Sequence, residues 1–236
     1  MEREGVIQIA EAYARKRGQT VDAWTEGLPH VCRKLALDSK KCSPLWGGED
    51  KEGVTADFVR GVAWLLAQDI YTFPRTFSEV SAIERIQLKG EKIIQNDTRW
   101  PGLRFWARYL GFATGDERSF LVDPTVAIRS ELEHMGRQAN VFDAKTFVTE
   151  LAERLPVLDT GAYREEVEVK LVKTEWREPP PKHLSTSLSF ALWRLHLGGT
   201  IALESKADAK EGYVLAGRNY RTEREFTHVR IAGVKQ

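Results

Sequence analysis

The sequence lacks the features of a secreted or membrane-embedded protein. It contains only two cysteines, Cys32 and Cys42, which are too few for a disulfide framework. No apolar run reaches the length of about 18 residues that spans a bilayer, and no charged-then-apolar leader follows Met1. We therefore expect a cytoplasmic protein with free thiols and no membrane contact.

Net charge is also almost absent. The 35 lysines and arginines are balanced by 34 aspartates and glutamates, so the formal charge is +1. Because no overall field would draw this chain to nucleic acid, any contact with DNA must come from a local patch. Hydrophobic residues make up 42% of the sequence and charged residues 29%, which is typical of a folded globular protein and excludes wholesale disorder.

Signatures of cofactor and metal chemistry are scarce. Neither a phosphate-binding GxxxxGK[ST] loop nor the glycine fingerprint of a dinucleotide-binding fold occurs. His30, Cys32 and Cys42 could form part of a zinc site, but the sequence offers no clear fourth ligand and no Cys-x-x-Cys pair. The sequence therefore predicts a protein without cofactor, metal or enzymatic activity.

One enzymatic alternative stays open, a metal-dependent nuclease. Such an enzyme uses two carboxylates to hold a divalent cation and a lysine to steady the attacking water, with a Glu-x-Lys pair on a strand. Asp159, Glu168 and Lys170 have workable spacing for this site. The intervening TGAYREEVE favours a helix, whereas VEVKLVK alternates as a strand would.

The chain shows a helical pattern that recurs in two halves. Residues 4–17 and 21–37 favour two helices, and a polar, glycine-rich stretch follows over 38–53. Three helices are predicted next, over residues 55–71, 78–89 and 99–112. An extended arm over 119–122 follows them, which gives the order of elements found in a winged helix.

The second half repeats this order. Its predicted elements are helices over 142–155, 160–172 and 184–197, a β-hairpin from 200–204 and 213–216, and a strand over 226–231. FWARYLGFAT and LWRLHLGGTIAL occupy the same place in the two halves, which indicates a loose internal repeat. We therefore predict a mainly α protein with small β-wings, of the α+β class, with tandem winged-helix-like domains. The predicted units are an N-terminal helical segment (1–53), a first winged-helix-like domain (54–135) and a second one (136–236).

The helix over 99–112 has the clearest pattern. Leu103, Trp106, Ala107 and Leu110 recur at helical spacing and are predicted to face the core. Its other side carries two arginines one turn apart, with Phe105, Tyr109 and Phe112 beside them. Guanidinium groups and rings together can hold phosphates and stack on bases, although arginines on a helix of a neutral protein often form only a solvated face. The predicted nucleic-acid-binding residues are Arg99, Arg104, Arg108, Arg118 and Arg129.

The helix over 184–197 has two apolar stripes. Leu188, Ala191, Leu192 and Leu195 form a core stripe, and a second stripe contains Phe190, Trp193 and Leu197. A DNA-reading helix would be mainly polar and basic on its outward face. The second stripe therefore packs within its own domain, binds a protein partner or, as a third alternative, contacts DNA. The predicted partner-binding residues are Phe105, Tyr109, Phe190, Trp193 and Leu197.

Several strings of the sequence together resemble one protein family. They are NDTRW, FWARYLGFA, the DPT of residues 123–125, LPVLDTGAYREEVE, and LSTSLSFALWRL with the closing FTHV. Over roughly residues 55–231 they resemble the DpdG proteins, accessory components of bacterial islands that place 7-deazaguanine derivatives in DNA and restrict foreign DNA. The resemblance implies a non-catalytic subunit of a DNA-linked defence complex and supplies no catalytic residues.

A second resemblance rests on architecture only. Tandem winged-helix partners of SMC-type ATPases use their winged helices for protein contacts, and the predicted order of elements is similar to theirs. Our leading hypothesis is a non-enzymatic adaptor in a bacterial anti-phage or DNA-modification-linked complex, with other protein subunits and double-stranded DNA as partners. The alternatives are the nuclease and the scaffold partner of an SMC-type ATPase.

Overall fold

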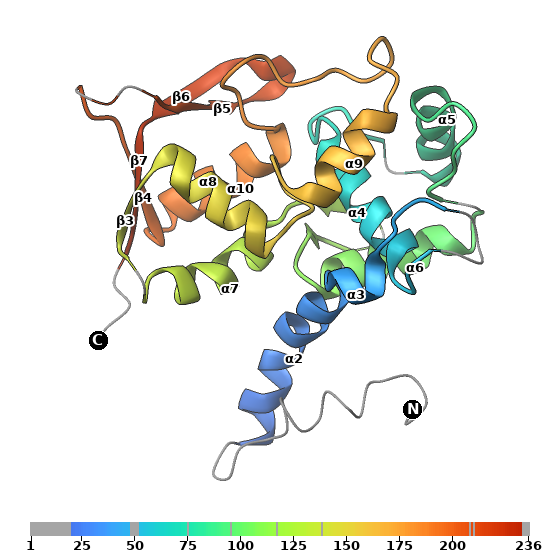
Figure 1. Cartoon of the computed structure of the whole chain (residues 1–236), viewed down its shortest axis with the longest axis horizontal. Coiled ribbons are helices and arrows are strands. Elements are labelled where there is room, and N and C mark those ends of the chain that lie inside the picture. The colour runs from blue at the N-terminus through green and yellow to red at the C-terminus, as the bar shows by residue number, and fades with distance from the viewer. Residues whose placement is uncertain are drawn as a thin grey trace.

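The computed structural model describes residues 20–47, 52–74, 76–94, 96–116, 118–137, 139–207, 209 and 211–232. The helix predicted over 4–17 lies outside them. The first described helix, α2 (Val21–Ala36), confirms the second predicted N-terminal helix, and the short α3 (Ser39–Cys42) follows it. Figure 1 shows α2 extending from a body of helices that carries small sheets at one end.

The other elements agree with the predicted α+β class. The helices are α4 (Ala56–Ala67), α5 (Phe77–Gln87), α6 (Arg99–Tyr109), α7 (Thr125–Met135), α8 (Ala144–Arg154), α9 (Ala162–Lys170) and α10 (Thr186–Leu197). The strands are β1 (Ala113–Thr114), β2 (Leu121–Val122), β3 (Val141–Asp143), β4 (Ile201–Glu204), β5 (Tyr213–Ala216), β6 (Thr222–Phe226) and β7 (His228–Ile231). A 3-10 turn, η2 (Arg218–Tyr220), joins β5 to β6. The stretch with the VEVK alternation is therefore helical, as α9.

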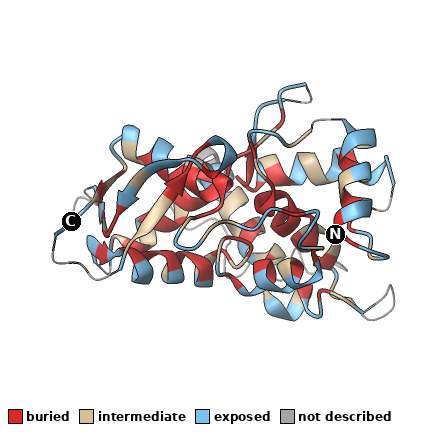
Figure 2. Cartoon of the chain, turned by 90° about the horizontal axis from the view of Figure 1, so that it is seen from above, coloured by how far each residue is buried: buried red, intermediate tan, exposed pale blue. Residues whose placement is uncertain are grey.

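Helix α4 lies at the centre of the packing. Every residue of this helix except Asp57 and Phe58 is buried, as expected for a helix that is apolar on nearly all sides. Its neighbours include α6, α9 and α10. Buried residues form one hydrophobic cluster that reaches from Leu37 to Ile231, and Figure 2 shows them running through the middle of the chain.

The buried C-terminal end of α4 is capped by side chains from a distant segment. The carbonyl oxygens of residues 66–68 accept hydrogen bonds from Ser187 Oγ (2.7 Å), Trp176 Nε1 (2.9 Å) and Thr186 Oγ1 (3.3 Å), in that order. The last carbonyls of a helix have no partner within the helix, and leaving them buried without one is costly. These three donors therefore allow α4 to end inside the core.

Helix α2 is fixed to the body through a buried arginine. Arg33 donates to the carbonyl of Leu110 (2.8 Å), just after α6, and lies 3.6 Å from the buried carboxylate of Glu131 on α7. Burial raises the pKa of Glu131, but the hydrogen bond from His30 and the charges of His30 and Arg33 outweigh burial and leave this pKa below its usual value. The predicted boundary at residue 53 stays a prediction.

The strand pairing differs from the predicted hairpin. Strand β4 pairs with β7, β7 also pairs with β3, and β5 pairs with β6, all antiparallel. The hairpin predicted from residues 200–204 and 213–216 is therefore wrong. Ile201 and Leu203 share a buried face with Val229 and Ile231, and this common burial selects a partner that is distant in sequence. The predicted strand over 226–231 is divided between β6 and β7.

A buried glutamate holds the loop that follows α5. Glu84 accepts hydrogen bonds from the backbone N–H groups of Ile93 and Ile94, both at 2.5 Å. Burial raises the pKa of this carboxyl, although the two N–H groups act in the opposite direction. Glu84 thereby positions two isoleucines that line a groove beside α6.

Replacing Ser187 with alanine should destabilise the fold without changing its shape. The substitution leaves the carbonyl of Leu66 buried without its donor, which costs about 1–3 kcal/mol in the free energy of unfolding. Urea denaturation measures this loss. The control is Ser78→Ala on an exposed position of α5, which should change stability by less than about 0.5 kcal/mol. Equal effects of the two substitutions would contradict the proposed role of the cap.

Replacing Glu84 with glutamine should change how stability depends on pH. The pKa of Glu84 is higher in the folded state than its usual value of 4.5. The stabilisation by Glu84 is therefore fully present below pH 4.5, and it is lost as the pH rises through the pKa of the folded state. The wild type should therefore lose stability relative to Glu84→Gln as pH increases toward neutrality. Urea titrations at several pH values test this, and a constant difference between the two proteins would refute it.

Candidate functional site

Helix α6 turns a different face to the core than its sequence predicted. Trp100, Ala107 and Leu110 are buried and Leu103 is half-buried, whereas Trp106 is 47% exposed. The prediction that Trp106 faces the core is therefore wrong. The helix begins at Arg99, and Trp100 in its first turn is buried. The buried face therefore follows Trp100, Ala107 and Leu110, and Trp106 lies outside it.

Three exposed rings form what we call the α6 aromatic cluster, made of Phe105, Trp106 and Tyr109. Phe105 is 53% exposed and Tyr109 is 37% exposed. The ring centroid of Phe105 lies 5.4 Å from that of Trp106 and 6.3 Å from that of Tyr109. The centroids of Trp106 and Tyr109 are 5.7 Å apart. The rings therefore support one another on the surface. Contiguous exposed aromatic groups of this kind mark interaction sites.

Phe112, which was predicted to lie beside these rings, is buried instead. Gly111 has a φ of 82°, and the N–H of Phe112 donates to the carbonyl of Ala107 at 2.8 Å. This left-handed glycine ends the helix and reverses the chain. The reversal carries Phe112 into the core.

The arginines of α6 lie on two sides of the aromatic cluster. The Arg104 guanidinium lies 5.4 Å from the ring centroid of Trp100, and Arg108 Nη1 donates to the carbonyl of Gly115 at 3.3 Å. Arg99 is separated from these two arginines by about 140–180° around the helix axis. Its guanidinium lies 3.6 Å from Asp57 on α4. The five predicted nucleic-acid-binding residues therefore do not form one continuous patch.

The other two predicted arginines also lie apart. Arg118 is exposed in the turn between β1 and β2, where its backbone N–H donates to Asp116 at 2.8 Å. The side-chain hydrogen bond from Ser119, backbone N–H groups and the charge of Arg108 lower the pKa of Asp116, so Arg108 and Arg118 both neighbour this carboxylate. Arg129 lies in a separate hollow, on α7.

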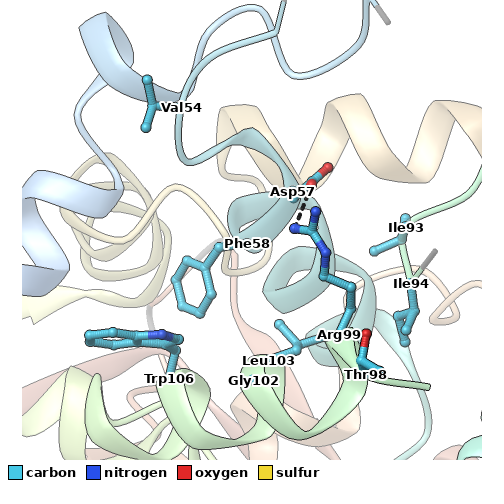
Figure 3. A pocket seen from close by; sticks show the side chains of 10 residues that line it. All are labelled: Val54, Asp57, Phe58, Ile93, Ile94, Thr98, Arg99, Gly102, Leu103 and Trp106. Atoms are coloured by element: carbon cyan, nitrogen blue, oxygen red, sulfur yellow. Dashed lines mark ion pairs between the residues drawn. The ribbon is translucent and has the colours of Figure 1, made fainter. Parts of the chain in front are cut away.

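A groove of about 330 Å³ runs beside the aromatic cluster, between α4, α6 and the loop before α6. Figure 3 shows Phe58 and Trp106 on one side and Ile93 and Ile94 on the other, with the Asp57–Arg99 ion pair between them. The remaining lining residues are Val54, Thr98, Gly102 and Leu103. No pattern in the sequence indicates this groove, because its walls are separated by about forty positions and meet only through packing.

Helix α10 carries the second predicted apolar stripe. Its predicted core residues Leu188, Ala191, Leu192 and Leu195 are all buried, which confirms that face. Phe190 is half-buried, Trp193 is 36% exposed and Leu197 is 68% exposed. The guanidinium of Arg194 lies 5.7 Å from the ring centroid of Phe190, and that of Arg224 lies 5.9 Å from the ring centroid of Trp193. Arginines therefore border this stripe as well.

The three residues of the nuclease alternative have structural partners. Asp159 accepts hydrogen bonds from the backbone N–H and the hydroxyl of Ser185, both at 2.6 Å, and in this way orients the residue that caps α10. The buried Arg164 lies 3.7 Å from Asp159 and 2.5 Å from Glu168. Lys170 contacts another carboxylate. Glu168 and Lys170 lie on a helix rather than on a strand, and a guanidinium occupies the position between the two carboxylates.

Of the residues considered for zinc, His30 has other partners and the two cysteines are free thiols. His30 Nδ1 lies 3.3 Å from Glu131, and its ring stacks on His134 with centroids 5.2 Å apart. Cys42 is buried and Cys32 is half-buried, both as free thiols. Within the described ranges, no three His, Cys, Asp or Glu side chains are grouped so that they could hold a metal ion.

Comparison with known proteins identifies the family. Nothing among curated proteins or solved structures matches the chain. In the part of the chain that the structure describes, no helix has both the length and the apolar character needed to cross a membrane. A family model described as DpdG-like matches residues 1–209. This match covers most of the 236 residues, and it confirms the resemblance found in the sequence: the chain belongs to the DpdG-like family.

Proposed function

We propose that the protein is a non-catalytic adaptor subunit of the bacterial DNA-modification system with which its family is associated. In this role it binds another protein subunit through the α6 aromatic cluster and contacts double-stranded DNA through Arg104, Arg108 and Arg118. The observation that carries the proposal is the exposure of Phe105, Trp106 and Tyr109 together on one helix face.

The chemistry of this cluster fits a protein partner. Aromatic residues and arginine are enriched in the buried centres of protein interfaces, where they supply most of the binding energy. Phe105, Trp106 and Tyr109 already contact one another, so little side-chain entropy is lost when a partner covers them. The structural roles of Asp159 and Glu168 in ion pairs with Arg164 support the non-catalytic part of the proposal.

The proposal includes tandem winged-helix-like units. In a winged helix, the strand after the first helix pairs with the last strand, and that strand pairs with the one after the third helix. The order β3–β7–β4 follows this rule when α7, α8 and α10 serve as the three helices and α9 is an insertion. In the first unit, α4, α5 and α6 precede the hairpin β1–β2. This assignment moves α7 into the second unit.

The DNA contact is the second part of the proposal. Arg108 and Arg118 lie beside the β1–β2 turn, which would be the wing of the first unit, and Arg104 lies one turn before Arg108 on α6. Guanidinium groups on a helix and its wing can position a protein on phosphates. Since the net charge is only +1, this patch would supply the local attraction that the whole chain lacks.

Replacing Phe105 and Tyr109 with serine should abolish binding of the partner protein. A tagged chain expressed in its native host should co-purify with other subunits, and the double variant should lose them at least tenfold, as expected when two interface anchors are removed. The matched control is Val169→Ser, which changes an exposed apolar residue on α9. Equal recovery of the same subunits by all three proteins would contradict the proposal.

Replacing Arg104 and Arg108 with glutamine should weaken DNA binding in a salt-dependent manner. Loss of two phosphate contacts should reduce the slope of log affinity against log salt by about 1.8. Fluorescence anisotropy with duplex DNA over a salt series measures the slope. Arg129→Gln provides a comparison, because Arg129 lies in a separate hollow. An unchanged slope in the double variant would exclude Arg104 and Arg108 as phosphate contacts.

A further inference from the structure

Among the described residues that line it, the groove beside the aromatic cluster combines an apolar interior with a single cation, Arg99. Phe58, Leu103 and Trp106 form its apolar part together with the two isoleucines that Glu84 positions. Arg99 stands at its edge with 61% of its side chain exposed. A ligand in this groove therefore meets a mainly hydrocarbon wall, with the guanidinium of Arg99, the carboxylate of Asp57 and the hydroxyl of Thr98 as polar groups.

Arg99 is only partly satisfied by its neighbour Asp57. The Asp57 carboxylate also forms an ion pair with Arg60, which is buried on α4 and additionally contacts Glu52 at 2.6 Å. Arg60 therefore keeps the Asp57 side chain against α4. The guanidinium of Arg99 lies 3.6 Å from this shared carboxylate. A carboxylate supplied from outside can approach the solvent side of Arg99 and form the close, charge-assisted hydrogen bonds that Asp57 does not form.

We infer that this groove binds a segment of a partner protein that presents an apolar side chain and, within about one helical turn, a carboxylate. The apolar side chain enters between Phe58 and Leu103, and the carboxylate bonds to Arg99. The inference rests on the proposed adaptor function, because it specifies part of the surface that the partner covers. It also assigns Arg99 to a protein contact instead of the nucleic-acid contact predicted from the sequence.

The lining favours a protein segment over a nucleotide. Phe58, Leu103 and the two isoleucines offer no hydrogen bonds to the polar edges of a base. Among the described uncharged lining residues, the polar groups are the Thr98 hydroxyl and the Trp106 indole N–H. Burying unmatched polar groups is costly, whereas an aliphatic or aromatic side chain loses nothing there.

The structure also offers a way to close the groove without disturbing the fold. Gly102 lies on α6 and lines the groove, and a Cβ placed on it would meet no atom within 4 Å. Gly102→Phe therefore fills the groove, and it replaces a helical glycine that has a low helix propensity. Gly27→Phe is the matched control, because Gly27 lies on α2 and a Cβ there also meets nothing within 4 Å.

The test uses 4-phenylbutyrate as the probe, with its neutral amide for comparison, and NMR titration of the full chain. The acid should shift the backbone signal of Gly102 and the indole N–H signal of Trp106, and the amide should bind about two- to fivefold more weakly, as expected for one exposed ion pair. Arg99→Gln should remove that difference. Gly102→Phe should abolish binding of both compounds, and Gly27→Phe should leave it unchanged.

Equal binding of acid and amide by the wild type would overturn the inference, and so would signal shifts that map away from the groove. Shifts of the same signals caused by oligothymidylate, with no response to the acid, would also overturn it and would assign the groove to nucleic acid. If Gly102→Phe retains the co-purifying subunits that Phe105→Ser with Tyr109→Ser loses, the groove inference fails and the adaptor proposal stands. If no subunit depends on Phe105 and Tyr109, the adaptor proposal fails whatever the probe shows.

Discussion

The capping of helix α4 by the segment 176–187 is the constraint on which the other contacts depend. A helix buried on nearly all sides can end inside a protein only if its last carbonyl groups find donors there. Ser187, Trp176 and Thr186 provide these donors more than a hundred positions along the chain. The first half of the fold is therefore completed by the second half.

A central α4 also determines the geometry of the proposed interaction surface. Helix α6 approaches α4 closely because Gly61 has no side chain: a Cβ there would lie 2.8 Å from Leu103. This contact fixes the rotation of α6, and its remaining sides carry the aromatic cluster, Arg99 at the groove, and Arg104 with Arg108 beside the β1–β2 turn. One rigid helix thus carries both surfaces of the proposal, the face proposed to bind a protein and the flank proposed to contact DNA.

Local patterns predicted the helices well and the strand partners poorly. Six helices, α4, α5, α6, α8, α9 and α10, lie where the hydrophobic periodicity predicted them. Ser185 caps α10, as Ser and Thr residues do at helix starts. The hairpin between 200–204 and 213–216 was wrong, because pairing depends on which strands share a buried face and not on which are adjacent in sequence. The exposed stripe of α10 was predictable from spacing, whereas the exposure of Trp106 was not.

The sequence by itself determined the helical elements, the α+β class, the absence of a strong net charge, and the family. Each of these follows from composition, from spacing within one element, or from short strings of residues. The tertiary structure alone decided the groove beside α6, the separation of the five arginines, and the burial of Phe112. These features require contacts between residues that are distant in the chain, and the hydrophobic pattern of a single helix contains no information about which neighbour covers it.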